Sequence, residues 1–247
     1  MISVELRKLI VEAAYTANHG HIPSAMSIVE SIIAIHEVKK PDDIFILSKG
    51  HGVLAYYAYL CYINEITKVE LLNFGKKNSN LGGHPDRNKI KSVYASTGSL
   101  GHGLPIAVGA ALANKIKHSL NRIYCLIGDG ESNEGTIWES LSVASNLKLN
   151  NLICIVDNNK SQIRSLPATN LIEKFKSFGW YTVEVNGCDV DELKNAMLIK
   201  SEFPIAIIAN TIKGNGLKLL ENNMFGWHHK SPTEIEFNQF IKELNEN

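Results

Sequence analysis

Four apolar runs of strand length, each ending at polar residues, constrain this 247-residue chain more than any other feature. The runs are "RIYCLIG" (122–128), "NLICIVD" (151–157), "WYTVEVN" (180–186) and "PIAIIAN" (204–210). Segments with helical periodicity lie between them, at 134–148, 170–179 and 189–201. Strands that alternate with helices favour right-handed crossovers and a parallel sheet that is buried on both faces. We therefore predict an α/β fold: a doubly wound, mostly parallel sheet with helices on both faces.

The region upstream of these strands is more varied. Residues 3–17 and 24–38 have the spacing of amphipathic helices, 45–52 is typical of a short strand that enters a loop, and 103–117 predicts a helix rich in small residues. The stretch 75–103 is Gly-rich and weakly periodic, and a loop of that length is usually functional or disordered. With no repeat or linker in view, we expect one domain over residues 1–247 with a C-terminal helical tail.

The charge balance narrows the possible partners. Lys plus Arg and Asp plus Glu number 25 each, so no net field attracts nucleic acid or an anionic membrane. Four cysteines without a C-x-x-C pair indicate neither a disulfide framework nor a zinc site. The amino terminus lacks the apolar core of a signal peptide, and no apolar run reaches the length of a membrane span. We expect a soluble cytoplasmic protein that binds neither nucleic acid nor membrane.

Polar residues follow two consecutive strands where each strand ends. Asp129 follows the first, and two asparagines, the second of them Asn159, follow the next. Ligands of open parallel sheets bind outside the carboxyl ends of the strands, where these side chains are expected to meet. Carboxylate and amide oxygens suit Mg²⁺ or Ca²⁺. Gly128 and Gly130 allow the main chain to approach a phosphate, and a helix that opens at 134–136 favours an anion at its N-terminus.

A simpler interpretation is open for each half of this pattern. Asp129 alone caps a helix, and the asparagines alone make a turn, because Gly-Asp-Gly is common turn chemistry. The presence of both motifs on consecutive strand ends favours a binding site. A plain metal-dependent phosphate-binding domain, with no need of any organic cofactor, remains one alternative.

Gly-Asp-Gly followed about 27 residues later by Asn-Asn resembles the thiamine diphosphate motif. The resemblance implies thiamine diphosphate as cofactor, bound through Mg²⁺ or Ca²⁺. Asp129 and Asn159 are then side-chain ligands of the metal, and the main-chain carbonyl of Ser161 is a third ligand. Glu134 matches an acidic residue that the family uses where two catalytic subunits communicate. The motif implies the cofactor and leaves the reaction open.

Four histidines narrow the range of reactions that the motif leaves open. His21, His51, His84 and His228 each lie beside a glycine or an aromatic residue in a predicted loop or element end. With "SKGHG", "GGHP" and "TGSLGHG" in order, they resemble the active site of transketolase over roughly residues 10–230. The resemblance places His21 and His228 near the reactive carbon and diphosphate of the cofactor, and His51 and His84 near substrate hydroxyls. Imidazoles suit proton transfer near neutral pH.

The same resemblance implies further contacts. Gly98, Ser99 and Leu100 would contact the cofactor, and Lys213, in "TIKGNG", would bind it and lead into the loop of His228. Two positions differ from the family pattern: Gly-His-Ile-Pro-Ser stands around the first histidine, and His102 stands where Gln is common. Both fall near the predicted site and favour an unusual donor or acceptor sugar.

Full-length transketolases are much longer and carry a second thiamine-binding domain, which supplies a glutamate to the aminopyrimidine of the cofactor. This sequence offers no candidate for that domain, and it resembles the N-terminal half of a split transketolase. The resemblance implies that the partner is a C-terminal transketolase subunit, that the assembly is a heterotetramer, and that the reaction transfers a two-carbon ketol unit from a ketose to an aldose. The substrates would be sugars or sugar phosphates.

Two rivals to this hypothesis are open. The alpha chain of a 2-oxo acid dehydrogenase shares the Gly-Asp-Gly and Asn-Asn pair, although not the spread of histidine motifs. A cofactor-binding module without catalysis is the other rival, because both departures from the family pattern fall near the predicted site.

Overall fold

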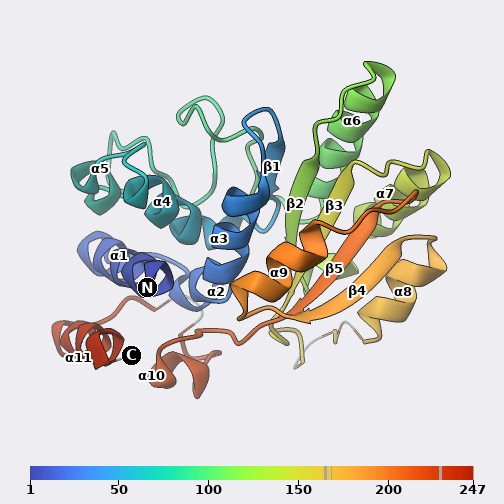
Figure 1. Cartoon of the computed structure of the whole chain (residues 1–247). Helices are drawn as coiled ribbons and strands as arrows, with labels where there is room; N and C mark the ends of the chain where they lie inside the picture. Colours follow the sequence, from blue (N-terminus) through green and yellow to red (C-terminus); the bar gives the residue numbers. More distant parts are fainter. Residues whose placement is uncertain (164–165, 168, 228–229, 247) are drawn as a thin grey trace.

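The computed structural model describes residues 1–163, 166–167, 169–227 and 230–246, and a five-stranded sheet forms its centre (Figure 1). The strands are β1 (Ile44–Leu47), β2 (Ile123–Gly128), β3 (Leu152–Asn158), β4 (Tyr181–Asn186) and β5 (Ile205–Asn210). They lie in the order β1-β2-β3-β5-β4, and every neighbouring pair is parallel. The predicted α/β fold with a parallel sheet is confirmed.

Alternation along the central strands divides the core into two layers. Tyr124 is opposite Ile153 in the register of β2 and β3, and both side chains pack into the core on one face. The next pair, Cys125 and Cys154, packs into the core on the other face. Because successive side chains of a strand point to opposite faces, apolar residues at every position require cover on both sides.

Helices provide that cover (Figure 1). The core on the first face includes side chains of α1 (Ile2–Ala17), α3 (Val29–Val38), α4 (Val53–Tyr62) and α9 (Val190–Met197), of which α9 contacts β4 and β5. The second face packs against α6 (Gly103–Ile116), α7 (Gly135–Asn146) and α8 (Leu171–Ser177). The prediction of helices on both faces is therefore confirmed, with boundaries that differ from the predicted ones by a few residues.

One predicted helix is interrupted. The segment 24–38 forms two helices, α2 (Ile22–Met26) and α3, with Ser27 and Ile28 between them. The Ser27 hydroxyl donates a hydrogen bond of 2.8 Å to the carboxylate of Asp157 at the end of β3. The break therefore coincides with a polar side chain that contacts a buried carboxylate.

Several short elements have weak sequence signals. They are the 3₁₀ turns Gly50–Gly52 and Glu131–Asn133, and the helices α5 (Lys68–Leu72) and α10 (Lys218–Glu221). The C-terminal helix, α11 (Glu234–Glu246), packs on α1, where the rings of Tyr15 and Phe237 stack with centroids 4.4 Å apart. The four cysteines are free. None of the described helices has both the length and the apolar character needed to cross a membrane.

Candidate functional site

The carboxyl ends of three central strands converge on one cavity. The main-chain N–H of Asp129, after β2, donates to the carbonyl of Asp157 at 3.1 Å, and Thr211, after β5, donates to the carbonyl of Asn158 at 3.3 Å. These bonds continue the parallel ladder beyond the strands and align their ends. The cavity has a volume of about 500 Å³. It is lined by His21, Ser24, Lys49, His51, Gly98, Leu100, Gly128, Asp129, Gly130, Glu131, Asn133, Glu134, Asn159, Ser161, Gln162, Leu166 and Lys213.

Ser161 joins the two side chains that the sequence predicts to bind a metal. Its hydroxyl donates to Asp129 Oδ1 at 3.0 Å, and its main-chain N–H donates to Asn159 Oδ1 at 3.0 Å. Asp129 and Asn159 are both buried. Their side-chain oxygens therefore lie around a single turn, as the alignment of consecutive strand ends requires.

The donor set has the chemistry of a hard-cation site. The described residues contain no cluster of three or more His, Cys, Asp or Glu side chains that could hold a metal ion. The Asp129 carboxylate and the Asn159 amide meet at Ser161, and their oxygens are donors of the kind that Mg²⁺ and Ca²⁺ take together with phosphate and water. The residues present thus fit a cation that is shared with a phosphate ligand.

The second asparagine of the pair, rather than the first, belongs to the site. Asn158 donates through Nδ2 to Asn210 Oδ1 at 2.7 Å, and Asn210 in turn donates to Glu184 Oε1 at 2.7 Å. This chain of bonds runs across the sheet toward β4. Asn158 is therefore engaged with β5, while Asn159 faces the cavity.

A buried ion pair below the cavity was missed in the sequence. The ammonium of Lys49 contacts the carboxylate of Asp157, and both side chains are closed to solvent. Ser27, Thr211 and Asn159 also donate to this carboxylate. A buried charge is tolerated when it is paired and its remaining lone pairs are bonded. A carboxylate that ends a buried apolar run was the available signal, and Lys49 lies inside the quoted "SKGHG".

Burial sets the electrostatics of the cavity floor. It raises the pKa of the Asp129 carboxyl, and the nearby charge of Asp157 raises it further. Burial also lowers the pKa of Lys213 to about 8, and the charge of Lys49 acts in the same direction. Burial therefore disfavours the charged forms of Asp129 and Lys213, and an ionic ligand would offset this cost.

Glu131, a second residue missed in the sequence, holds three loops together. Its carboxylate accepts from the Ser48 hydroxyl, from Gly101 N at 2.9 Å and from Gly128 N at 3.1 Å. These partners follow β1, precede α6 and end β2. Burial raises the pKa of this carboxyl. The segment that includes Gly98 and Leu100 is thereby fixed against the strand ends.

The histidines divide into two groups. His21 and His51 both line the cavity, with ring centroids 5.5 Å apart. His84 is exposed and lies outside the lining, although a Cβ on Gly98 would come within 3.1 Å of its ring. Partial burial, and then the charge of His19, lowers the pKa of His84. His228 lies outside the described residues.

The remaining predicted residues occupy the rim and walls. Gly98, Leu100 and the exposed Glu134 line the cavity. Ser99 does not line it, and its hydroxyl instead lies 3.2 Å from Nδ1 of His102. Gln162, which the sequence did not single out, lies directly against Gly130, so that any side chain at that glycine would meet its amide.

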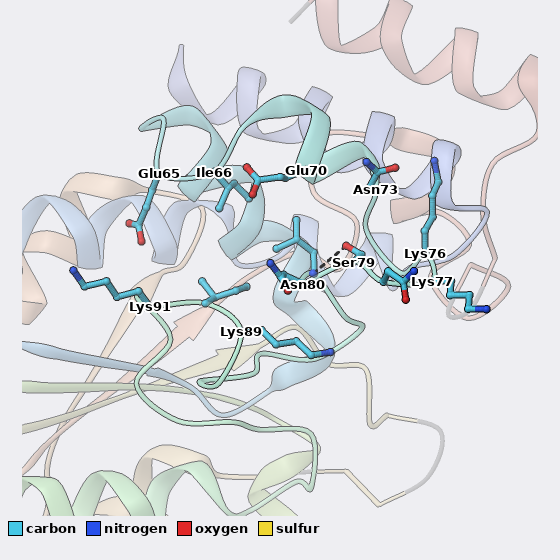
Figure 2. A pocket seen from close by; sticks show the side chains of 13 residues that line it. Glu65, Ile66, Glu70, Asn73, Lys76, Lys77, Ser79, Asn80, Lys89 and Lys91 are labelled. Atoms are coloured by element: carbon cyan, nitrogen blue, oxygen red, sulfur yellow. Dashed lines mark hydrogen bonds between the residues drawn. The ribbon is translucent and has the colours of Figure 1, made fainter.

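A second cavity, of about 610 Å³, lies beside α5 and the loop after it (Figure 2). Its lining includes Lys76, Lys77, Lys89, Lys91, Glu65 and Glu70. The Glu70 carboxylate is committed to the N-terminus of α5, where it accepts from the N–H and hydroxyl of Thr67. The side chains of Lys76 and Lys91 extend in different directions in Figure 2, and all four lysines are exposed. Their charges do not converge on one point, so the candidate site remains at the strand ends.

A parallel sheet with a polar cavity at the carboxyl ends of its central strands places this chain among the α/β proteins that carry a ligand site at that edge of the sheet. Residues 1–236 match the family model described as "Transketolase, thiamine diphosphate binding domain". The chain therefore belongs to the transketolase family, and it corresponds to that thiamine diphosphate-binding domain.

Similar proteins fall into two groups by length. The chain is 36% identical to one of the subunits of apulose-4-phosphate transketolase from Actinobacillus succinogenes, with 96% of this chain and 92% of that protein covered. It is 35% identical to human transketolase, of which it spans only 41%. The crystal structure of Campylobacter jejuni transketolase matches with a TM-score of 0.87 and 29% identity, over 99% of this chain and 42% of that chain. The expected resemblance to N-terminal subunits of split transketolases is confirmed.

Proposed function

We propose that the cavity binds thiamine diphosphate together with one divalent cation, Mg²⁺ or Ca²⁺. The observation that carries this proposal is the meeting of Asp129 and Asn159 through Ser161 at the strand ends. Their side-chain oxygens, with the main-chain carbonyl of Ser161, would hold the cation. Gly128 and Gly130 would approach the diphosphate, and the buried ammonium of Lys213 would neutralise part of its charge.

The reaction we propose is transfer of a two-carbon ketol unit from a ketose to an aldose. When bound, thiamine diphosphate supplies the electron sink for breaking and forming the carbon–carbon bond. The chain would bind and orient the cofactor and move protons at sugar oxygens through His21 and His51, which face the same cavity. His84 and His228 stay predictions for this role, as do Gly98, Ser99, Leu100 and Glu134 for theirs.

We further propose that residues 1–247 act as one diphosphate-binding domain and require a second chain. Two relatives that this chain covers by 91% or more are each named as a single subunit of an apulose-4-phosphate transketolase, which implies that another chain completes the enzyme. The proposed partner is a C-terminal transketolase subunit that supplies the glutamate for the aminopyrimidine, in a heterotetramer. The cytoplasmic location expected from the sequence stays a prediction.

The substrate class follows from the relatives' names only as a proposal. One group is named for apulose 4-phosphate, and a relative from Clostridium sp., 34% identical, is named for 6-deoxy-6-sulfo-D-fructose. These names support an uncommon ketose as donor, as do the sequence departures at the first histidine and at His102. Assays should therefore begin with these two ketoses.

The test begins with binding. Tryptophan fluorescence of the purified chain, titrated with thiamine diphosphate with and without Mg²⁺, should show saturable binding only when the metal is present. Equal binding of thiamine diphosphate with and without Mg²⁺ would contradict the proposed metal site. Affinity capture from the native lysate, with masses of the retained chains, should then identify the partner chain.

The reconstituted pair separates the rivals. Ketol transfer without release of carbon dioxide supports a transketolase, whereas decarboxylation of a 2-oxo acid supports the dehydrogenase alternative. His51→Ala should abolish most turnover and leave cofactor binding intact. A pair that binds the cofactor but transfers nothing from any ketose would favour a binding module without catalysis.

A further inference from the structure

The side-chain amide of Asn159 has two ends of similar size, and only its oxygen can bind a metal ion. Its Nδ2 lies 2.8 Å from Asp157 Oδ2, and its Oδ1 accepts from Ser161 N at 3.0 Å. A deprotonated carboxylate accepts hydrogen bonds and donates none. Asp157 therefore holds the NH₂ end of Asn159 inward and leaves the oxygen toward Ser161 and Asp129.

Three further segments hold the Asp157 carboxylate in place. Lys49, after β1, provides the ion pair. Ser27, in the break between α2 and α3, donates at 2.8 Å, and Thr211, after β5, donates to the other oxygen. The side chain is closed to solvent. Because these partners hold the Asp157 carboxylate in one position, it contacts the Asn159 amide from one fixed direction.

We propose that Asp157 is a positioning residue whose carboxylate, held by Lys49, fixes the Asn159 amide with its oxygen toward the metal site. This inference rests on the proposed function, because it requires a metal beside Asp129 and Asn159. A purely structural role, in which the network only closes the core below the cavity, would affect stability and leave metal binding unchanged.

The decisive change is Asp157→Asn. An asparagine at this position presents both a donor end and an acceptor end, so that the N–H of Ser161 alone still selects the orientation of the Asn159 amide. Asp157→Asn is compared with wild type, in which Lys49 holds the carboxylate. Because the substitution leaves the ammonium of Lys49 buried without its counter-charge, Lys49→Met with Asp157→Asn, in which neither charge is present, is measured beside it.

The measurement is the Mg²⁺ concentration that half-saturates thiamine diphosphate binding, followed by tryptophan fluorescence with the full chain and any partner that copurifies. We expect Asp157→Asn to raise this concentration by about 10- to 100-fold, the usual effect of removing an outer partner of a metal ligand. Thr211→Val is the matched control. It removes a donor to the far oxygen of Asp157, keeps the charge and the contact with Asn159, and should leave the Mg²⁺ requirement unchanged.

The outcomes separate the two proposals. Wild-type chain that binds the cofactor without metal overturns the proposed function, and this inference with it. If wild-type chain binds the cofactor only with metal, but Asp157→Asn has the same Mg²⁺ requirement as wild type, the positioning role alone is overturned. Where the unpaired ammonium prevents Asp157→Asn from folding, Lys49→Met with Asp157→Asn is compared with wild type, and an unchanged Mg²⁺ requirement in that variant likewise overturns the positioning role.

Discussion

The first residue of α6, Gly103, lies so close to Ser48 that a Cβ atom on it would come within 2.7 Å of the Ser48 Cα. Gly103 N also donates to the Ser48 hydroxyl at 3.1 Å, and that hydroxyl donates to Glu131. The start of α6 is thus held against the end of β1 at the place where the cavity begins. Only a glycine fits between the two backbones.

Substitution at two glycines of the same helix should therefore have opposite effects. Gly103→Ala should destabilise the chain by about 1–3 kcal/mol, because the added methyl group meets main-chain atoms that cannot move alone. Gly109→Ala should stabilise it by about 0.5–1 kcal/mol, since nothing lies within 4 Å of the new Cβ and alanine favours helix. Urea unfolding measures both, and equal effects would contradict the close approach.

The ion pair of Lys49 and Asp157 gives a second prediction about stability. Lys49→Met should cost about 3–5 kcal/mol, because it leaves a buried carboxylate without its counter-charge. Lys49→Met combined with Asp157→Asn should cost less than Lys49→Met alone, since no charge is then left unpaired. Urea unfolding of the wild type, both single variants and the double variant completes the cycle. Additive losses would show that the two groups do not interact.

The sequence alone predicted the parallel sheet and the polar residues at the ends of its strands. Buried parallel strands are apolar at nearly every position, so their ends are visible, and Asp129 and Asn159 are found where alignment of two ends must bring them. Charged residues inside the core give no such signal. Lys49 and Glu131 act through partners more than 25 residues away in the chain, at Asp157, Ser48 and Gly101.

The break in the predicted helix 24–38 has the same origin. Local spacing favours one continuous helix, whereas the structure breaks it at Ser27, whose hydroxyl contacts Asp157, distant in sequence. Ser99 shows a related limit. It lies within a matched motif, and its hydroxyl lies near His102 and not in the cavity lining, so its contact with the cofactor stays a prediction. A motif locates a loop, whereas the direction of each side chain depends on tertiary packing.

Asp129→Asn should raise the stability of the chain without metal and weaken its binding of the cofactor. The raised pKa of Asp129 means that the folded chain without metal binds more protons than the unfolded chain between the ordinary pKa and the raised one. Stability contributed by this group therefore falls as pH rises through that window, and at pH 7 the ionised carboxylate is a net cost. The asparagine removes that cost and keeps an oxygen for the hydrogen bonds from Gly130 and Ser161.

We therefore expect Asp129→Asn to unfold at a higher urea concentration than wild type when a chelator is present. The Mg²⁺-dependent binding of thiamine diphosphate should be strongly weakened in the same variant, because a neutral amide is a poorer ligand than a carboxylate. A variant that is less stable without metal, or one that binds Mg²⁺ as well as wild type, would argue against this account of the site.

Lys213 predicts how cofactor binding depends on pH. Burial lowers its pKa to about 8, from an ordinary value of 10.5. Below pH 8 the free chain carries the charged ammonium that an anionic diphosphate requires. Above pH 8 the ammonium is largely deprotonated, and binding must take up a proton. The affinity for thiamine diphosphate should therefore fall as pH rises through 8, by up to about tenfold per pH unit.

The stability of the free chain should depend on pH in the opposite direction to its affinity for the cofactor. Between pH 8 and 10.5 the unfolded chain holds the proton of Lys213 more firmly than the folded chain, so this group makes the chain without cofactor more stable as pH rises. This gain belongs to the free chain alone, because bound diphosphate favours the charged ammonium.

Two substitutions test the role of Lys213 in binding. Lys213→Gln should flatten the pH dependence of cofactor binding and lower the affinity at pH 7, because the amide carries no charge at any pH. Lys218→Gln, at an exposed lysine on the following helix, should preserve the wild-type profile. Fluorescence titrations at saturating Mg²⁺, from about pH 6.5 to about pH 9.5, compare the three chains across the titration of the lysine. If the profile of Lys213→Gln follows that of wild type, the proton is taken up by another group, and Lys213 does not contact the diphosphate as an ammonium.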